Sequence, residues 1–215
     1  MQNLRVKEIT LTAVLTAIII VLGAVPQLGF IQITPMVGLT IIHIPVFIGA
    51  YFGGRYVGGF LGFVFGFTSF LVALTRPSAP LDPVFTNPLV SILPRFLVGF
   101  FAIDVLHFFQ KRFKQQYLAD GLYFAVMTIL HSVLVVTLLY IAGVNYWYLD
   151  VYGIAEGITR DSTLGAIEFV SNYFIGGSIF GFFVTILIVN SLLEIAACVL
   201  VGTPISNRLK VAIKE

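Results

Sequence analysis

The chain of 215 residues has a formal net charge of only +2, and 59% of its residues are hydrophobic while 10% are charged. Soluble domains contain about 25% charged residues, so this composition excludes an ordinary soluble protein and indicates a membrane protein. The single cysteine, Cys198, excludes an intrachain disulfide.

Apolar segments of transmembrane length, or close to it, follow one another along the chain. They cover residues 9–25, 39–52, 56–74, 90–109, 121–143 and 174–202. A transmembrane helix needs about 20 mainly apolar residues, so these segments predict six helices, of which the second is short. The predicted fold class is an all-α membrane protein in which residues 1–215 form a single six-helix transmembrane domain.

Lysine and arginine are distributed unevenly over the connections between these segments. Nine of the 12 lie on one side: Arg5, Lys7, Arg55, Lys111, Arg112, Lys114, Arg208, Lys210 and Lys214. The opposite side carries Arg76 and Arg160, and Arg95 lies inside the fourth segment. Because basic residues favour cytoplasmic loops, both termini are predicted to be cytoplasmic.

Small residues recur at four-residue intervals on the first and third predicted helices. Ala13 and Ala17 share one face of the first helix, where this spacing lets another helix, from the same chain or from a partner protein, approach closely. On the third helix the same spacing predicts close packing within the protein. The glycines concerned are Gly54, Gly58, Gly62 and Gly66.

Few ionisable residues lie inside the apolar segments. His43, His107 and His131 stand apart on separate predicted helices, where we expect packed or hydrogen-bonded side chains. Asp104 and Glu194 lie toward the predicted cytoplasmic ends of the fourth and sixth helices, where we expect structural or coupling contacts. The sequence has no Walker-type loop, no HExxH motif and no Cys/His metal spacing. It therefore predicts neither an enzyme nor an ATPase, and no metal site or cofactor.

Arg95 lies about one turn inside the predicted outer end of the fourth helix, where an unpaired charge is costly. Its guanidinium would suit a carboxylate-bearing ligand that reaches the site from outside, because the planar fork binds carboxylates through two hydrogen bonds. Two structural explanations remain open. Arg95 could anchor at the membrane interface, or it could pair with an acid of the outer loops. Those acids are Asp82, Asp150, Glu156 and Glu168.

Polar and aromatic residues accompany Arg95 in the two long outer connections, residues 75–89 and 144–173. Long loops in compact proteins often carry function, although an interfacial aromatic belt would use the same rings. The predicted substrate-binding residues are Asn87, Ser91, Arg95, Asn145, Tyr146, Trp147, Glu168, Asn172 and Tyr173.

Three stretches resemble the substrate-binding S components of energy-coupling factor (ECF) vitamin transporters. They are "AVLTA" at 13–17, "IPVFIGAYFGGRYVGGFLGFVFGFTSFL" at 44–71 and "FTNPLVSILPRFLVG" at 85–99. The resemblance implies a protein of the bacterial cytoplasmic membrane that captures a vitamin at the outer face. It also implies docking on a shared module, formed by the transmembrane coupling subunit EcfT and two ATPase subunits, EcfA and EcfA'. Within that resemblance, Ala13 and Ala17 correspond to the contact with the coupling subunit.

The Asn-Pro and Pro-Arg elements are most similar to the pantothenate-specific members of that family. Pantothenate offers a carboxylate for Arg95, hydroxyls and an amide for the asparagines, and two methyl groups for aromatic walls. Members specific for pyridoxine or hydroxymethylpyrimidine, riboflavin or folate are alternatives within the same class. A self-sufficient secondary carrier is an alternative of another class, and a membrane enzyme or chaperone-like protein is a third.

Overall fold

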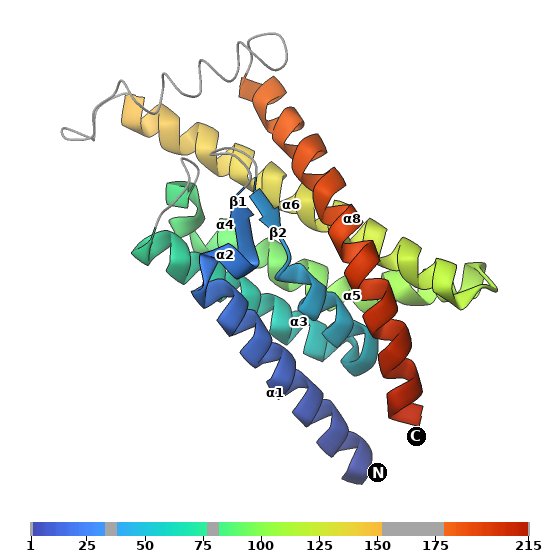
Figure 1. The fold of residues 1–215 in the computed structure, drawn as a ribbon. Coiled ribbons are helices and arrows are strands. Elements are labelled where there is room, and N and C mark those ends of the chain that lie inside the picture. The colour runs from blue at the N-terminus through green and yellow to red at the C-terminus, as the bar shows by residue number, and fades with distance from the viewer. Residues whose placement is uncertain (1, 33–37, 77–81, 152–178, 215) are drawn as a thin grey trace.

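The computed structural model describes residues 2–32, 38–76, 82–151 and 179–214, which are almost entirely helical (Figure 1). Its elements are α1 (Gln2–Ala24), α2 (Pro26–Gly29), β1 (Phe30–Gln32), β2 (Gly38–Thr40), α3 (His43–Thr75), η1 (Asp82–Thr86), α4 (Pro88–Ser91), α5 (Leu93–Arg112), α6 (Gln116–Val151) and α8 (Ile179–Lys214). Strands β1 and β2 pair antiparallel, and the sequence did not predict this small hairpin.

Five helical stretches of the described residues are long and apolar enough to cross a membrane, which agrees with the predicted all-α membrane protein. They are Val6–Ala24, His43–Thr75, Pro88–Arg112, Gln116–Ala142 and Leu187–Ala212. The difference from the six predicted helices arises in α3, which contains both the second and the third predicted segment.

Helix α3 reverses direction at Gly54. The backbone there has φ 76° and ψ −164°, a conformation that essentially only glycine adopts. A Cβ added at Gly49 would clash with Leu61 Cδ1, although residues twelve apart along one straight helix are separated by about 18 Å. The two arms of α3 therefore run antiparallel, as the predicted break between residues 52 and 56 requires. The first arm, residues 43–53, is only about 16 Å long and follows the β hairpin.

The second arm of α3 packs backbone to backbone against α5. A Cβ added at Gly58 or Gly62 would clash with the carbonyl oxygen of Gly99 or Arg95, and one at Gly66 would lie 2.6 Å from Ile92 Cα. The predicted internal packing is therefore confirmed for these three glycines. Gly54 does not belong to that row, because an added Cβ there would meet nothing within 4 Å.

Helix α1 covers α3 with one face only. Leu15 and Ile19 are buried in the hydrophobic core that includes α3, whereas Ala13 and Ala17 are exposed. No described part of the chain covers the face that carries these two alanines.

The two termini lie at the same end of the molecule (Figure 1). Ion pairs join the elements at that end and at the α3 reversal. Arg55 binds Asp104 at 2.7 Å, and Lys210 near the end of α8 binds the buried Asp120 near the start of α6. Tyr51 also donates a hydrogen bond to Asp120. Helices α3, α5, α6 and α8 are thereby held together.

Candidate functional site

Four ionisable side chains are buried where the start of α3 meets α5, α6 and α8. Their exposed fractions are 1% for His43 and 5% each for Arg95, His131 and Glu194. Buried ionisable groups in a membrane protein are costly, and they often mark a binding site or pathway. We call these four residues the buried polar site.

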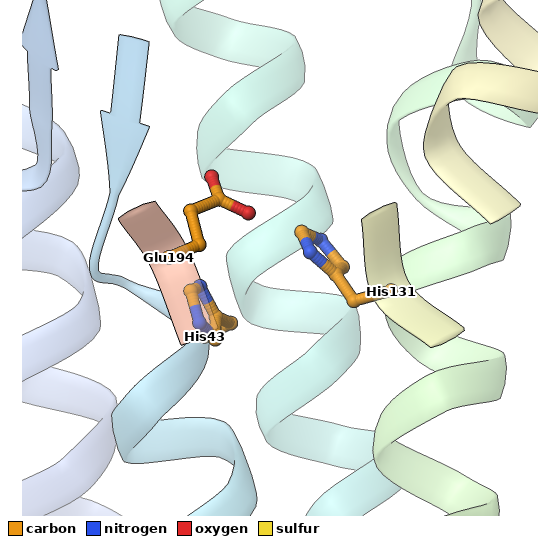
Figure 2. Close-up of side chains that lie close together, drawn as sticks. All are labelled: His43, His131 and Glu194. Atoms are coloured by element: carbon orange, nitrogen blue, oxygen red, sulfur yellow. The ribbon is translucent and has the colours of Figure 1, made fainter. Parts of the chain in front are cut away.

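Three of them, His43, His131 and Glu194, form a compact triad. Each offers one ring nitrogen or carboxylate oxygen, and these three atoms all lie within 4.8 Å of one another. Figure 2 shows the side chains converging from the start of α3, from α6 and from α8. The two imidazole rings stack with their centroids 5.4 Å apart.

Glu194 is oriented by the neighbours of both histidines. Its Oε1 accepts a hydrogen bond from the backbone N–H of Thr40 at 3.1 Å, three residues before His43. Its Oε2 accepts one from the hydroxyl of Ser132 at 3.1 Å, next to His131 on α6. These contacts fix the carboxylate against β2 and α6, so the triad is held by three separate elements.

The two histidine rings have no such orienting hydrogen bonds from the described residues. Neither Nδ1 nor Nε2 of His43 or His131 has a hydrogen-bond partner among the described residues. Leaving a buried polar group unpaired costs about 1–3 kcal/mol, and each neutral imidazole has one donor and one acceptor to satisfy. The triad therefore has unused hydrogen-bonding capacity directed into the protein interior.

Arg95 lies beside the triad. Its Nη1 donates a hydrogen bond to the carbonyl oxygen of Val90 at 2.6 Å, and its guanidinium carbon lies 5.0 Å from the ring centroid of Phe85. Its Nε has no partner, and Arg95 forms no salt bridge, among the residues that the structure describes. The charge of Glu194 still acts on it across the site.

Phe65 on α3 connects the two parts of the site. The Arg95 guanidinium carbon lies 5.5 Å from the Phe65 ring centroid, and the His131 ring lies 5.7 Å from the same ring. An apolar wall is thus flanked by a cation on one side and by the triad on the other. Such a mixture of apolar surface and a few convergent polar groups is typical of small-molecule sites.

The residues predicted around Arg95 have different positions. Ser91 is buried, and its hydroxyl donates to the carbonyl oxygen of Phe85. Asn87 is exposed and caps α4, where its side chain accepts a hydrogen bond from the Leu89 N–H at 3.0 Å. Arg95 itself is more deeply buried than an interfacial anchor would be.

The remaining predicted residues are described only in part or not at all. Helix α6 continues to Val151, so Asn145, Tyr146 and Trp147 lie on a helix and not in the predicted loop, and only their backbone is described. Glu168, Asn172 and Tyr173 lie outside the described residues. Of the four acids proposed as partners of Arg95, Glu156 and Glu168 lie there too.

Two expectations about ionisable residues were wrong. His43 and His131 do not stand apart, because packing brings their rings together across 88 positions of the sequence. Glu194 does not share a level with Asp104: it contacts Thr40 before the first arm of α3, whereas Asp104 pairs with Arg55 after that arm. The sequence signal that could have found the triad was the rarity of ionisable residues within apolar segments.

Comparison with known proteins agrees with a transporter. A family model described as "ECF transporter, substrate-specific component" matches residues 7–206. The pantothenic acid transporter PanT of Lactococcus lactis subsp. cremoris (strain MG1363) is 29% identical over 155 residues, which cover 66% of this chain and 76% of that protein. The pantothenate transporter PanT of Leuconostoc mesenteroides subsp. mesenteroides is 33% identical over 102 residues, or 46% of this chain and 50% of that protein.

The apolar helices and the family match together describe a multi-pass protein of the cell membrane, and a transporter subunit rather than an enzyme. Since the match covers nearly the whole chain, the protein belongs to the family of ECF transporter substrate-specific components.

Proposed function

We propose that this protein captures pantothenate at the outer face of the bacterial cytoplasmic membrane and passes it to a shared ATP-driven module. The module would consist of the coupling subunit EcfT and the ATPase subunits EcfA and EcfA'. The names of both relatives support pantothenate as the ligand. ATP hydrolysis would then be supplied by the module and not by this chain.

The observation that carries the proposal is the buried polar site. Pantothenate combines a carboxylate, an amide, two hydroxyls and two methyl groups on one carbon. Arg95 has an Nε without a partner among the described residues and a planar guanidinium that suits a carboxylate, and Phe65 beside it offers an apolar surface for the methyl groups. A neutral ring such as pyridoxine would offer Arg95 no carboxylate.

The proposal extends to residues on either side of this site. The predicted contributors from the outer segments, Asn145, Tyr146, Trp147, Glu168, Asn172 and Tyr173, would contribute contacts to a ligand held by Arg95. The exposed Ala13 and Ala17 would contact the coupling subunit, with six transmembrane helices and cytoplasmic termini as the arrangement in the membrane.

The test is calorimetric titration of the purified protein with pantothenate, followed by competition with pyridoxine, hydroxymethylpyrimidine, riboflavin and folate. We expect tight one-to-one binding of pantothenate that none of the four competitors displaces. Tight binding of a neutral ring in its place would keep the transporter family and refute the carboxylate assignment. If none of the five compounds binds, the capture of pantothenate by this subunit is refuted.

A further inference from the structure

The spacing of the triad suits one oxygen atom of a ligand. The three ligand atoms all lie within 4.8 Å of one another, so at the widest spacing this allows, a central point lies about 2.8 Å from each of them, which is an ordinary hydrogen-bond distance. A hydroxyl oxygen there would contact His43, His131 and Glu194 together. The three polar atoms thus converge where one small polar group could contact all of them, and Arg95 lies against the same Phe65 ring as His131.

The chemistry of the triad favours a neutral hydroxyl over an anion. An ionised Glu194 can only accept hydrogen bonds, and each of its oxygens already has one donor but retains further acceptor capacity. A neutral histidine provides one donor and one acceptor. A hydroxyl can donate to the carboxylate and accept from an imidazole N–H at the same time, whereas a second carboxylate beside Glu194 would be repelled.

A metal ion fits the triad less well. Zinc lies about 2.1 Å from its nitrogen and oxygen ligands, and three ligand atoms within 4.8 Å of one another can meet that requirement, so the spacing alone does not separate a metal from a hydroxyl. The positive charge of Arg95, however, acts on both Glu194 and His131. A divalent cation would have to bind next to that charge.

We propose that His43, His131 and Glu194 recognise a hydroxyl group of the ligand and thereby fix its orientation, with the carboxylate at Arg95 and the hydroxylated end at the triad. This inference rests on the proposed function, and it assigns the specificity of the site to three residues. Arg95 would then select ligands by their carboxylate, and the triad would independently select them by their hydroxyl. Loss of a ligand hydroxyl and loss of a triad residue should remove the same interaction.

The experiment pairs two ligands with two triad variants. The ligands are pantothenate and N-(3,3-dimethylbutanoyl)-β-alanine, which keeps the carboxylate, the amide and the methyl groups but lacks both hydroxyls. The variants are Glu194→Gln and His43→Gln, and the exposed His107→Gln serves as the control. Dissociation constants are measured by calorimetry for every pair, together with the thermal midpoint of each variant.

We expect Glu194→Gln to bind pantothenate at least about tenfold more weakly than wild type, because its hydrogen bond from the ligand hydroxyl is made to a charged group. His43→Gln should bind it about fivefold more weakly, because a hydrogen bond between neutral groups is lost. Binding of the analogue without hydroxyls should change by less than about threefold, since the lost interaction is already absent. His107→Gln should bind both ligands as wild type does. Using two variants protects the test against a misfolded one.

Three results would overturn the inference. The first is an equal loss of affinity for both ligands in folded variants, which would give the triad a purely structural role. The second is unchanged pantothenate affinity in both variants. The third is stoichiometric Co²⁺ binding, seen as a visible absorption band that His43→Gln abolishes, which would make the triad a metal site. Failure of the wild-type protein to bind pantothenate refutes the proposed function instead, and is recognised before any variant is measured.

Discussion

Arg95 is the residue whose environment is least explained by packing alone. Its side chain is buried between two phenylalanine rings, and among the described residues its guanidinium donates a hydrogen bond to the Val90 carbonyl oxygen. This neutral acceptor compensates a buried charge only in part, because the cost of desolvating an ion is several kcal/mol. A bound carboxylate would supply both the missing charge and an acceptor for Nε.

The substitution Arg95→Lys tests whether the guanidinium of Arg95 binds the carboxylate of the ligand. Lysine keeps the positive charge but lacks the planar fork, so we expect pantothenate affinity to fall by more than about tenfold. Calorimetry measures the change, and Arg55→Lys in the exposed pair with Asp104 is the matched control. Unchanged affinity of a folded Arg95→Lys protein would assign Arg95 a structural role.

At the scale of elements, the position of Arg95 depends on how closely α5 approaches α3. Gly62 lies against the Arg95 carbonyl oxygen, so the backbone that carries the guanidinium is packed directly on α3. An added methyl group there meets backbone, which cannot move aside as a flexible side chain can. Gly58, Gly62 and Gly66 therefore determine the geometry of the buried polar site as well as the stability of the packing of α3 on α5.

Gly62→Ala should consequently affect stability and binding together. Overpacking costs about 1–3 kcal/mol, which corresponds to a fall of about 5 °C in the apparent thermal midpoint, and pantothenate affinity should weaken as Arg95 shifts. Gly121→Ala on α6 is the control, because its added Cβ would lie 3.9 Å from the nearest atom, Thr203 Oγ1. Similar midpoints for the two variants would contradict close packing of α3 on α5.

The reversal of α3 gives a different prediction for Gly54. An alanine there has open space around its Cβ, but it must adopt φ 76° and ψ −164°. This conformation costs a residue other than glycine about 1–3 kcal/mol, so Gly54→Ala should lower the thermal midpoint despite the absence of any clash. Stability equal to wild type would mean that the chain does not reverse at Gly54.

At the scale of the whole molecule, one face of the bundle lacks a partner within the described chain. The exposed surface of α1 includes Ala13 and Ala17, and we propose that the coupling subunit covers it. The buried polar site lies in a different part of the fold, where α3, α5, α6 and α8 meet. Ligand binding and docking should therefore be separable by mutation.

Replacing Ala13 and Ala17 with leucine should leave the pantothenate affinity of the isolated protein unchanged, because neither residue contributes to the core. The same double variant should no longer co-purify with the coupling subunit and its ATPases, since bulky side chains prevent close helix approach. Ala196→Leu, at an exposed position of α8, controls for added bulk. Normal co-purification of the double variant would refute the docking face.

The features of the fold that the sequence predicts are those that depend on residues close together in the chain. The helical segments follow from apolar length, the break in α3 from its interrupted apolar pattern, and the close packing of α3 from glycine spacing. The triad could not be predicted in that way, because residues 43, 131 and 194 meet only through the rotation and register of three helices. Apolar composition on all sides of a membrane helix leaves that rotation unspecified.

Two element boundaries also escaped prediction. The second helix begins only at His43, because β1 and β2 pair before it, and the apolar residues 39–42 do not distinguish a strand from a helix. Helix α6 extends eight residues past its predicted end at 143, through a polar and aromatic stretch.

The most direct measurement is an experimental structure of the protein with bound pantothenate. We expect the ligand between α3, α5, α6 and α8, with its carboxylate about 3 Å from the Arg95 guanidinium and a hydroxyl about 3 Å from the triad. Pantothenate bound elsewhere, with Arg95, His43, His131 and Glu194 unaltered and out of contact, would contradict this placement.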